Sequence, residues 1–343
     1  MAILQIAADR PGSGKSSLSG ALLLHLTCAN RRAAYYKPLS KLAENDLDVA
    51  FFSQSLKANA AFTPPPAASP MPRSNSSLDA NLSTRVEAEV TRLKSLAESV
   101  LLEGPDLADT EGVVSPLPLE LSSATGSWIV AVFSYSKELT SDAIAESCQP
   151  LGERLAGVLI NSVTAYRGHH AKNVLGAELI NRGIPFLGAV PEDRTMLGVS
   201  VQQILDYLKG RWVQEPEHVD ARVERFLIGG NILDDGPSYF GRLANQAVIT
   251  RGARPDIQMA SLTSHPLCIV LTGGQEPAEY VKAEASQRGV PLILVDTNTI
   301  DTADSLSGLL DLATSRSVQK IQRFLHLLEE NADLEAMASL ALS

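Results

Sequence analysis

The sequence predicts an α/β protein of two units, of which the first and larger has a doubly wound parallel sheet covered by helices on both faces. Short, mostly apolar runs such as Ile3–Ala7 and Trp128–Phe133 are typical of buried strands. Amphipathic runs alternate with them, and in Thr84–Ser99 the apolar residues recur at helical spacing. This alternation indicates a parallel sheet buried on both faces. The composition, with 45% hydrophobic and 20% charged residues, is that of an ordinary globular protein.

The first unit is expected to span residues 1–212. Helices are predicted from Ser16 to about Leu26, over Thr84–Ser99 and over Lys172–Asn181. The segment Lys57–Ser83 is rich in proline and poor in apolar residues, so we expect a flexible loop there. The strands expected after Ile3–Ala7 are Ala33–Tyr36, Val100–Leu102, Trp128–Phe133, Gly157–Ile160 and Ile184–Val190.

A second, smaller α/β unit is expected over residues 220–315. Glu215–Glu217 is a plausible linker, and strands are predicted at Cys268–Leu271 and Leu292–Val295. Apolar residues recur at helical spacing in Ser317–Leu342, which predicts one long C-terminal helix over residues 316–343. The expected domains are therefore 1–212, 220–315 and 316–343.

The segment Asp9–Ser17 has the pattern of a phosphate-binding loop between a strand and a helix. Its glycines let backbone N–H groups converge on phosphate oxygens, and the helix that follows adds its positive dipole end. Lys15 can reach the β- and γ-phosphates of a nucleotide, and the Ser16 hydroxyl can bind Mg²⁺. Asp9 stands where the strict pattern has its first glycine. The predicted ligands are ATP and Mg²⁺, and the predicted nucleotide contacts are Gly12, Ser13, Gly14, Lys15, Ser16 and Ser17.

Charge and cysteine usage argue against several classes of protein. The net charge is −10 and no basic run occurs, so nucleic acid is not an expected partner. The three cysteines are far apart and form no CxxC pair, which argues against a disulfide framework or a zinc site. No signal peptide or apolar run long enough for a membrane span is visible. We expect a cytoplasmic protein with no membrane partner.

Five segments in order resemble the P-loop domain of dethiobiotin synthetases and cobyrinic acid diamide synthases. Besides the loop itself they are Tyr36–Pro38, Leu102–Gly104, Leu159–Asn161 and Leu187–Glu192. The resemblance implies that the amide of Asn161 reads the adenine base and that the backbone at Pro191 borders it. An amide has both a donor and an acceptor for this purpose, so ATP should be preferred to GTP.

A narrower resemblance is to the N-terminal half of long phosphate acetyltransferases, in which a DRTGG domain follows such a P-loop domain. The printed chain leaves no room for the acetyltransferase catalytic domain, so acetyl transfer is not expected. The stretches that carry the resemblance are Val158–Asn161, Arg182–Pro185 and Gly188–Arg194, then Ile228–Gly230, Thr250–Gln258 and Leu271–Gly274.

Three further side chains are candidates for the site. Lys37 follows a strand at the edge of the sheet where ligands bind, so it can act with Lys15 by neutralising phosphate or a small anionic substrate. Glu103 follows an apolar strand and can hold Mg²⁺ beside Ser16. The family resemblance places one more acidic metal ligand after Lys37. The candidates are Asp46 and Asp48, and we favour Asp48. The predicted metal ligands are Ser16, Asp48 and Glu103.

Two classes of function stay open. One is an ATP-dependent enzyme, either an ATPase or a carboxylate-activating ligase; the other is a nucleotide-dependent regulatory protein with at most slow ATPase activity. Pro105-Asp106 departs from the dethiobiotin synthetase pattern, and no glutaminase cysteine is visible, which argues against both synthetases. The resemblance to a non-catalytic half of a larger enzyme favours the regulatory function. A P-loop domain that only supports assembly is a third alternative.

The second unit is predicted to bind and associate rather than catalyse, because no pair of nucleophile and base is visible in it. Arg251 and Arg254 can receive an anionic ligand or a carboxylate of a partner. The resemblance to DRTGG domains implies self-association, so a homodimer through residues 220–315 is expected.

Overall fold

The computed structural model describes residues 2–41, 43–56, 59, 61–63, 65–66, 68–72, 77–109, 112–216, 219–230, 236–311 and 313–342. The chain divides into two compact units, residues 1–193 together with 315–343, and residues 194–314. Both ends of the chain therefore build the first unit. The sequence had suggested a boundary near residue 212 and a separate C-terminal helix.

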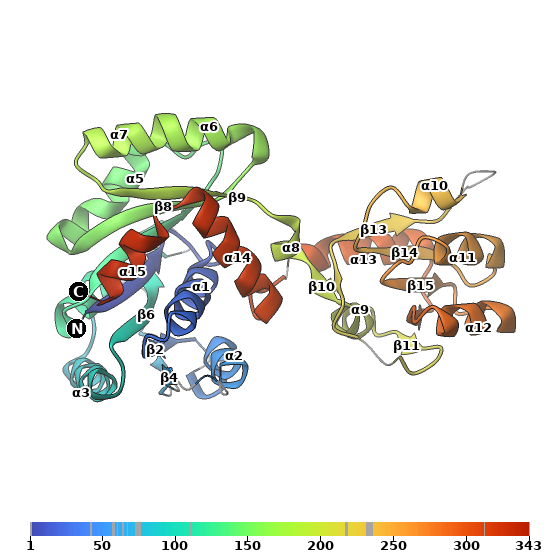
Figure 1. Ribbon diagram of the computed structural model, residues 1–343, viewed down its shortest axis with the longest axis horizontal. Helices are drawn as coiled ribbons and strands as arrows, with labels where there is room; N and C mark the ends of the chain where they lie inside the picture. Colours follow the sequence, from blue (N-terminus) through green and yellow to red (C-terminus); the bar gives the residue numbers. More distant parts are fainter. Residues whose placement is uncertain are drawn as a thin grey trace. The chain divides into compact units, whose positions relative to one another are not determined.

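A seven-stranded parallel sheet forms the centre of the first unit, in the order β4-β2-β6-β1-β7-β8-β9 (Figure 1). Successive crossovers place strands on both sides of the fully buried β1, which is the predicted doubly wound arrangement. A separate two-stranded sheet joins β3 (Leu39–Ser40) to β5 (Ser69–Pro70). The seven strands, in chain order, are β1 (Ile3–Ala8), β2 (Ala33–Tyr36), β4 (Phe62–Thr63), β6 (Ser99–Asp106), β7 (Trp128–Ser134), β8 (Leu155–Val163) and β9 (Phe186–Pro191).

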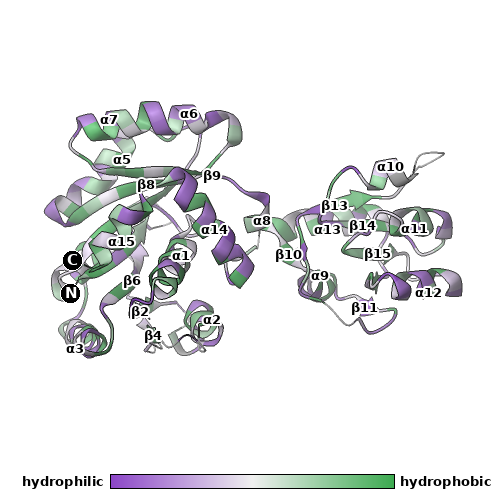
Figure 2. Ribbon diagram, viewed as in Figure 1, coloured by the Kyte–Doolittle hydropathy of each residue, from purple (hydrophilic) through white to green (hydrophobic). Residues whose placement is uncertain are grey.

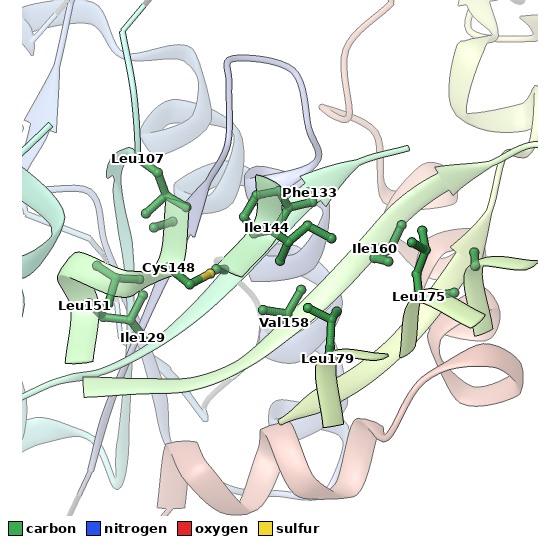
Figure 3. Close-up of a cluster of buried hydrophobic side chains, with 14 of the residues drawn as sticks. Leu107, Ile129, Phe133, Ile144, Cys148, Leu151, Val158, Ile160, Leu175 and Leu179 are labelled. Carbon is green, nitrogen blue, oxygen red and sulfur yellow. The ribbon is translucent and has the colours of Figure 1, made fainter. Parts of the chain in front are cut away.

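Helices cover both faces of this sheet. One face carries α1, α14 and α15, and the other carries α3, α4, α5 and α7. Figure 3 shows the apolar cluster beneath α5 and α7, where Phe133 and Ile160 of the sheet meet Ile144 and Leu179 of the helices. The helices of the unit are α1 (Lys15–Cys28), α2 (Leu47–Ser55), α3 (Ala80–Leu96), α4 (Leu117–Thr125), α5 (Ser141–Cys148), α6 (Gly168–His170), α7 (Gly176–Asn181), α14 (Val318–Asn331) and α15 (Leu334–Leu342).

The C-terminal segment differs from the single long helix that the sequence predicts. Ala332 is extended, with φ −142° and ψ 163°, and separates α14 from α15. At this break the Asp333 N–H donates to the Leu187 carbonyl at 2.7 Å, so the segment is tied to β9. Gly188 makes the approach possible, because a Cβ there would lie 2.5 Å from the Cα of Ala332. Apolar periodicity continues across the break, which is why it was missed.

The described residues of the proline-rich segment contain regular structure that the predicted loop lacks. Its described residues include β4 and β5, and α3 begins inside it at Ala80. Residues 57, 58, 60, 64, 67 and 73–76 lie outside the described part of the chain. Asp79 explains the early start of α3, since its side chain accepts from the Leu82 N–H at 2.8 Å and caps the helix.

The second unit has a five-stranded sheet in the order β11-β16-β15-β14-β13, parallel except for β11, and an antiparallel pair β10–β12. Helices α9 and α13 pack on one face of the larger sheet, and α10, α11 and α12 on the other. Its strands are β10 (Val199–Ser200), β11 (Arg211–Trp212), β12 (Arg222–Val223), β13 (Arg225–Ile228), β14 (Gln246–Arg251), β15 (Cys268–Thr272) and β16 (Leu292–Leu294). Its helices are α8 (Arg194–Leu197), α9 (Val201–Leu208), α10 (Gly236–Phe240), α11 (Pro255–Leu262), α12 (Glu279–Gln287) and α13 (Thr299–Asp311).

Hydropathy follows this layering in each unit. Figure 2 shows apolar residues concentrated on the strands and polar residues on the outer faces of helices such as α3 and α12. Within the described ranges, no helix combines the length and the apolar character needed to cross a membrane.

Candidate functional site

The loop between β1 and α1 has the backbone of a phosphate-binding loop. Gly12 and Gly14 have φ values of 82° and 107°, in the left-handed region that favours glycine. Gly14 is also the N-cap of α1, so the N–H groups of the first turn of the helix have no side-chain cap. A Cβ on Gly14 would lie 2.4 Å from the amide nitrogen of Asn161. Both conformation and space therefore require glycine at position 14.

Asp9 braces this loop. Its Oδ1 atom accepts a hydrogen bond from the Ser13 hydroxyl and a second one, at 3.2 Å, from the Ser134 N–H at the end of β7. The departure from the strict glycine pattern thus places a carboxylate where it ties the loop to the neighbouring strand. We infer that Asp9 holds the loop in shape, which a glycine could not do.

The side chains of Lys15 and Ser16 each meet a carboxylate from β6. The Lys15 ammonium forms an ion pair with Asp106, and the Ser16 hydroxyl donates to Glu103 Oε1 at 3.2 Å. Glu103 is 3% exposed and lies inside β6, which runs on to Asp106, rather than at the end of the strand as predicted. Ser16 and Glu103 therefore lie side by side.

Lys37 lies among three carboxylates instead of facing an empty anion site. Its ammonium is 2.6 Å from Asp48 Oδ2, 3.0 Å from Asp46 Oδ2 and 3.2 Å from Glu103 Oε1. Asp46 is the N-cap of α2, where it accepts the N–H groups of Asp48 and Val49, so the start of this helix fixes both aspartates. Lys37 already neutralises protein charge here, and its role toward a substrate stays a prediction.

Burial and charge shift the pKa values of this cluster in consistent directions. Burial would lower the pKa of Lys37, but the carboxylates of Glu103, Asp48 and Asp46 outweigh it and raise that pKa. Burial raises the pKa of Glu103, and the nearby Asp48 adds to the rise against the opposing charges of Lys37 and Lys15. Burial also raises the pKa of Tyr35, whose hydroxyl donates to Glu103 Oε2 at 2.9 Å.

An open cavity of about 320 Å³ lies against the loop. Gly12, Lys15 and Ser16 line one part of it, and the acidic cluster around Lys37 lines another. Arg316, from the segment before α14, reaches the same cavity and donates from Nη1 to Asp48 Oδ1 at 3.2 Å. Its volume is at the lower end of the range for small-molecule pockets.

The residues expected to contact the base lie apart from this cavity. Asn161 is 7% exposed inside β8, and its amide nitrogen donates to the Ser13 carbonyl at 2.8 Å. Pro191 ends β9 at the edge of the sheet. Neither lines the cavity. Asn161 supports the loop from below in this geometry, and reading of adenine stays a prediction.

The predicted metal ligands are only partly assembled. Ser16 and Glu103 present adjacent oxygen atoms, of the kind that Mg²⁺ prefers, whereas Asp48 faces Lys37 and Arg316. Among the residues that the structure describes, no three His, Cys, Asp or Glu side chains are placed to hold a metal ion by themselves. The oxygen donors of Ser16 and Glu103 suit a Mg²⁺ ion that takes its other ligands from phosphate and water.

In the second unit, the structure locates the glycine pair after β15 and the two candidate arginines. Gly273 and Gly274, after β15, have φ values of 85° and 69°. Arg254 pairs with Asp256 two residues later, and its hydrogen bond lowers the pKa of Asp256 to about 2. Arg251 ends β14 and is exposed. Binding of an anion by these arginines stays a prediction.

The sequence does not predict two charged residues of the site, Asp106 and Arg316. Asp106 could have been found, because it continues the β6 strand three residues after Glu103. Arg316 gives no local signal, since it lies 268 residues from the aspartate that it contacts.

Two family models match the chain. The model described as an AAA domain covers residues 3–198, and the one described as a DRTGG domain covers residues 203–309. A phosphate acetyltransferase from Nitratidesulfovibrio vulgaris is 23% identical over 98% of this chain and 51% of its own length. The chain thus spans about half the length of this curated relative.

Solved structures are similar to the first unit only at a coarse level. The cell division protein MinD of Aquifex aeolicus has a TM-score of 0.41 and 11% identity, covering 57% of this chain and 84% of its own. Cobyrinic acid a,c-diamide synthase of Mycobacterium smegmatis has a TM-score of 0.40 and 12% identity, covering 57% and 88%. With its phosphate-binding loop, its AAA domain match over more than half of the residues and its DRTGG domain, the chain belongs to the AAA domain family and has the domain order of the N-terminal half of long phosphate acetyltransferases.

Proposed function

We propose that the chain binds ATP with Mg²⁺ at the Asp9–Ser17 loop and acts as a nucleotide-dependent regulatory protein with at most slow ATPase activity. The observation that carries this proposal is the convergence of Lys15, Ser16 and Glu103 at one end of a parallel sheet, beside an open cavity. The loop supplies backbone N–H groups and a lysine for phosphate oxygens. Ser16 and Glu103 supply oxygen ligands for the metal ion.

When bound, Mg²⁺ would neutralise charge on the phosphate groups. The chain's own contribution is to hold the phosphates against the loop and to keep Lys15 within reach of them. Three carboxylates already hold the Lys37 ammonium, and its raised pKa keeps it protonated at neutral pH. Lys37 is therefore suited to orient an anion and not to act as a general base.

The direct test is titration of ATP into the chain and into Lys15→Ala. The loss of a charge-assisted contact to phosphate should weaken binding about 10–100-fold, with unchanged circular dichroism. Lys94→Ala, which removes an exposed lysine of α3, is the matched control and should bind as the unaltered chain does. Equal affinities in all three proteins would reject the loop as the site. Rapid formation of ADP from ATP by the unaltered chain would reject the regulatory function in favour of an enzyme.

An ATP-dependent ligase that activates a carboxylate is a second candidate. The cavity extends past the loop to Lys41 and Arg316, and to Lys37, which three carboxylates already hold, so it offers cationic groups beyond those needed for the nucleotide. A small carboxylate placed there would lie beside the phosphate. The rate of ADP formation from ATP, measured with each of a set of small carboxylic acids, tests this function. Acceleration by one acid, lost in Lys37→Ala, would favour the ligase.

We also propose that the chain forms a homodimer through the second unit. A truncation near residue 220 would not test this, because α14 and α15 belong to the first unit and would be lost. The intact chain should sediment as a dimer. Cross-linking of a mixture of ¹⁴N- and ¹⁵N-labelled chains should then join copies at Lys209 or Lys282 of the second unit. A monomer, or cross-links between copies only among lysines of the first unit, would reject the proposal.

A further inference from the structure

Arg316 belongs to the wall of the nucleotide cavity although it is 300 residues distant in sequence from the loop. Its side chain is 30% exposed and reaches Asp48, which in turn contacts Lys37. The segment that carries it is well fixed. Helix α14, which begins two residues later, packs against α1, with the Ile321 side chain so close to Gly20 that a Cβ there would lie 2.4 Å from it. Arg316 is therefore held in place against the helix that begins at the phosphate loop.

The cations of the cavity differ in how far their charge is already used. Lys15 is paired with Asp106, and Lys37 is surrounded by three carboxylates. Arg316 donates one hydrogen bond to Asp48 at 3.2 Å, the one acceptor that it has among the described residues. A guanidinium has five N–H donors in a planar fork that suits carboxylate and phosphate oxygens. Arg316 therefore has donors left for a ligand in the cavity.

Arg316 lies just after the second unit in the sequence. The second unit ends at Thr314, so Arg316 is the second residue after the chain returns to the first unit. The outgoing connection is fixed in the same way, because Asp193, the last residue before the second unit, accepts from Arg323 of α14 at 2.7 and 2.9 Å. Both connections are thus tied to the first unit by an arginine–aspartate pair, and one of these pairs lies in the cavity.

We propose that Arg316 binds an oxyanion beside the phosphate loop, either the terminal phosphate of ATP or a separate phosphate next to ADP. The inference rests on the proposed nucleotide site and identifies a ligand-contacting residue that the loop motif does not include. When the oxyanion engages Arg316, the guanidinium shares its donors between ligand and Asp48. Occupancy of the cavity is in this way linked to the segment that leads from the second unit.

Calorimetric titration of the full chain, Arg316→Ala, Arg316→Gln and Arg182→Ala tests the proposal. Arg182 is the matched control, because it also forms one ion pair with an aspartate of the first unit, Asp142, but does not line this cavity. Each protein is titrated with ATP, with ADP, and with inorganic phosphate after saturation with ADP. Thermal unfolding confirms that each variant is folded, and the glutamine variant keeps an uncharged polar side chain at this position if alanine does not fold.

If the terminal phosphate is the ligand, both Arg316 variants lose about tenfold in affinity for ATP and bind ADP as before. If a separate phosphate is the ligand, the loss appears in the phosphate titration of the ADP-bound protein. In either case hydrogen exchange of residues 315–331 should slow on filling the oxyanion site in the unaltered chain but not in Arg316→Ala. If both Arg316 variants match Arg182→Ala in every titration, the inference about Arg316 is overturned and the proposed function is not. An unaltered chain that binds no nucleotide overturns the proposed function and the inference with it.

Discussion

The ammonium of Lys15 and the carboxylate of Asp106 form an ion pair across the mouth of the phosphate loop. Both side chains are largely buried, with 16% and 23% of their surface exposed. The lysine that a nucleotide needs is therefore already paired within the chain. A phosphate that arrives at the loop must take Lys15 from Asp106, so this pair opposes binding.

Replacement of Asp106 by asparagine should raise the affinity for metal-free nucleotide. The residue keeps its size but loses its charge, so Lys15 no longer has a competing partner. A gain of about fivefold or more is expected, because about 1 kcal/mol is the upper value for exposed ion pairs and this pair is largely buried. The measurement is ADP titration in the presence of a chelator, since a metal ion would add interactions of its own with Asp106. Asp142→Asn removes the exposed partner of Arg182 and should change nothing. Weaker binding by Asp106→Asn would show that the aspartate positions Lys15 instead of competing for it.

Glu103→Gln separates a metal ligand from a structural carboxylate. The carboxylate lies beside the Ser16 hydroxyl and also holds Lys37 and the Tyr35 hydroxyl. If Glu103 contributes to the metal site, the affinity for ATP with Mg²⁺ should fall about tenfold, whereas metal-free affinity should fall much less. Titrations with and without Mg²⁺ measure both values. Equal losses in the two titrations would mean that Glu103 acts only within the protein.

Much of the fold could be predicted because its signals are local. The strand at Ile3–Ala8, the glycines of the loop and the start of α1 follow one another within a few residues, and each element has its own pattern. The break at Ala332 has no such pattern. It depends on a backbone contact with Leu187 and on the space left by Gly188, both from β9.

The candidate site was predictable only where the motif itself carries the function. Lys15 and Ser16 are positioned by the loop, and Glu103 by an apolar strand. The partners that set their charge come from distant segments, since Asp106 lies 91 residues from Lys15 and Arg316 lies 268 residues from Asp48. Family resemblance placed Asp48 beside a metal ion, and the structure places it between Lys37 and Arg316. Such pairings depend on how the sheet closes and have no signature in sequence.

Asp46 should make the first unit sensitive to acid. Burial would raise its pKa, but hydrogen bonds from the Ser40 hydroxyl and the Val49 N–H, with the charge of Lys37, outweigh burial and lower it. A carboxyl with a lowered folded pKa stabilises the protein above its unfolded pKa of about 3.9, and this stabilisation is lost as the pH falls through that value toward the folded pKa. Asp46→Asn keeps a good helix cap but cannot titrate.

The expected result is that the unaltered chain loses more unfolding free energy than Asp46→Asn between about pH 6 and pH 3. Urea titrations followed by tryptophan fluorescence measure it. Trp128 lies in the first unit and Trp212 in the second, so Trp212→Phe as a common background reports on the first unit alone. Parallel pH profiles for the two proteins would show that Asp46 does not govern acid sensitivity.

Asn161 should contribute equally to the affinity for every nucleotide. Its amide donates to the Ser13 carbonyl at 2.8 Å from a position that is 7% exposed, and it fills the space beneath Gly14. Asn161→Ala leaves that carbonyl without its partner and removes the support under the loop. Affinities for ATP, GTP and inorganic tripolyphosphate should therefore fall together, by about tenfold, as expected when a buried hydrogen bond is lost. Ser162→Ala, at the exposed neighbouring position, is the control and should leave all three affinities unchanged. Competition titrations with the three ligands measure the effect. A loss confined to ATP would mean that the amide leaves Ser13 to read the adenine base when nucleotide binds.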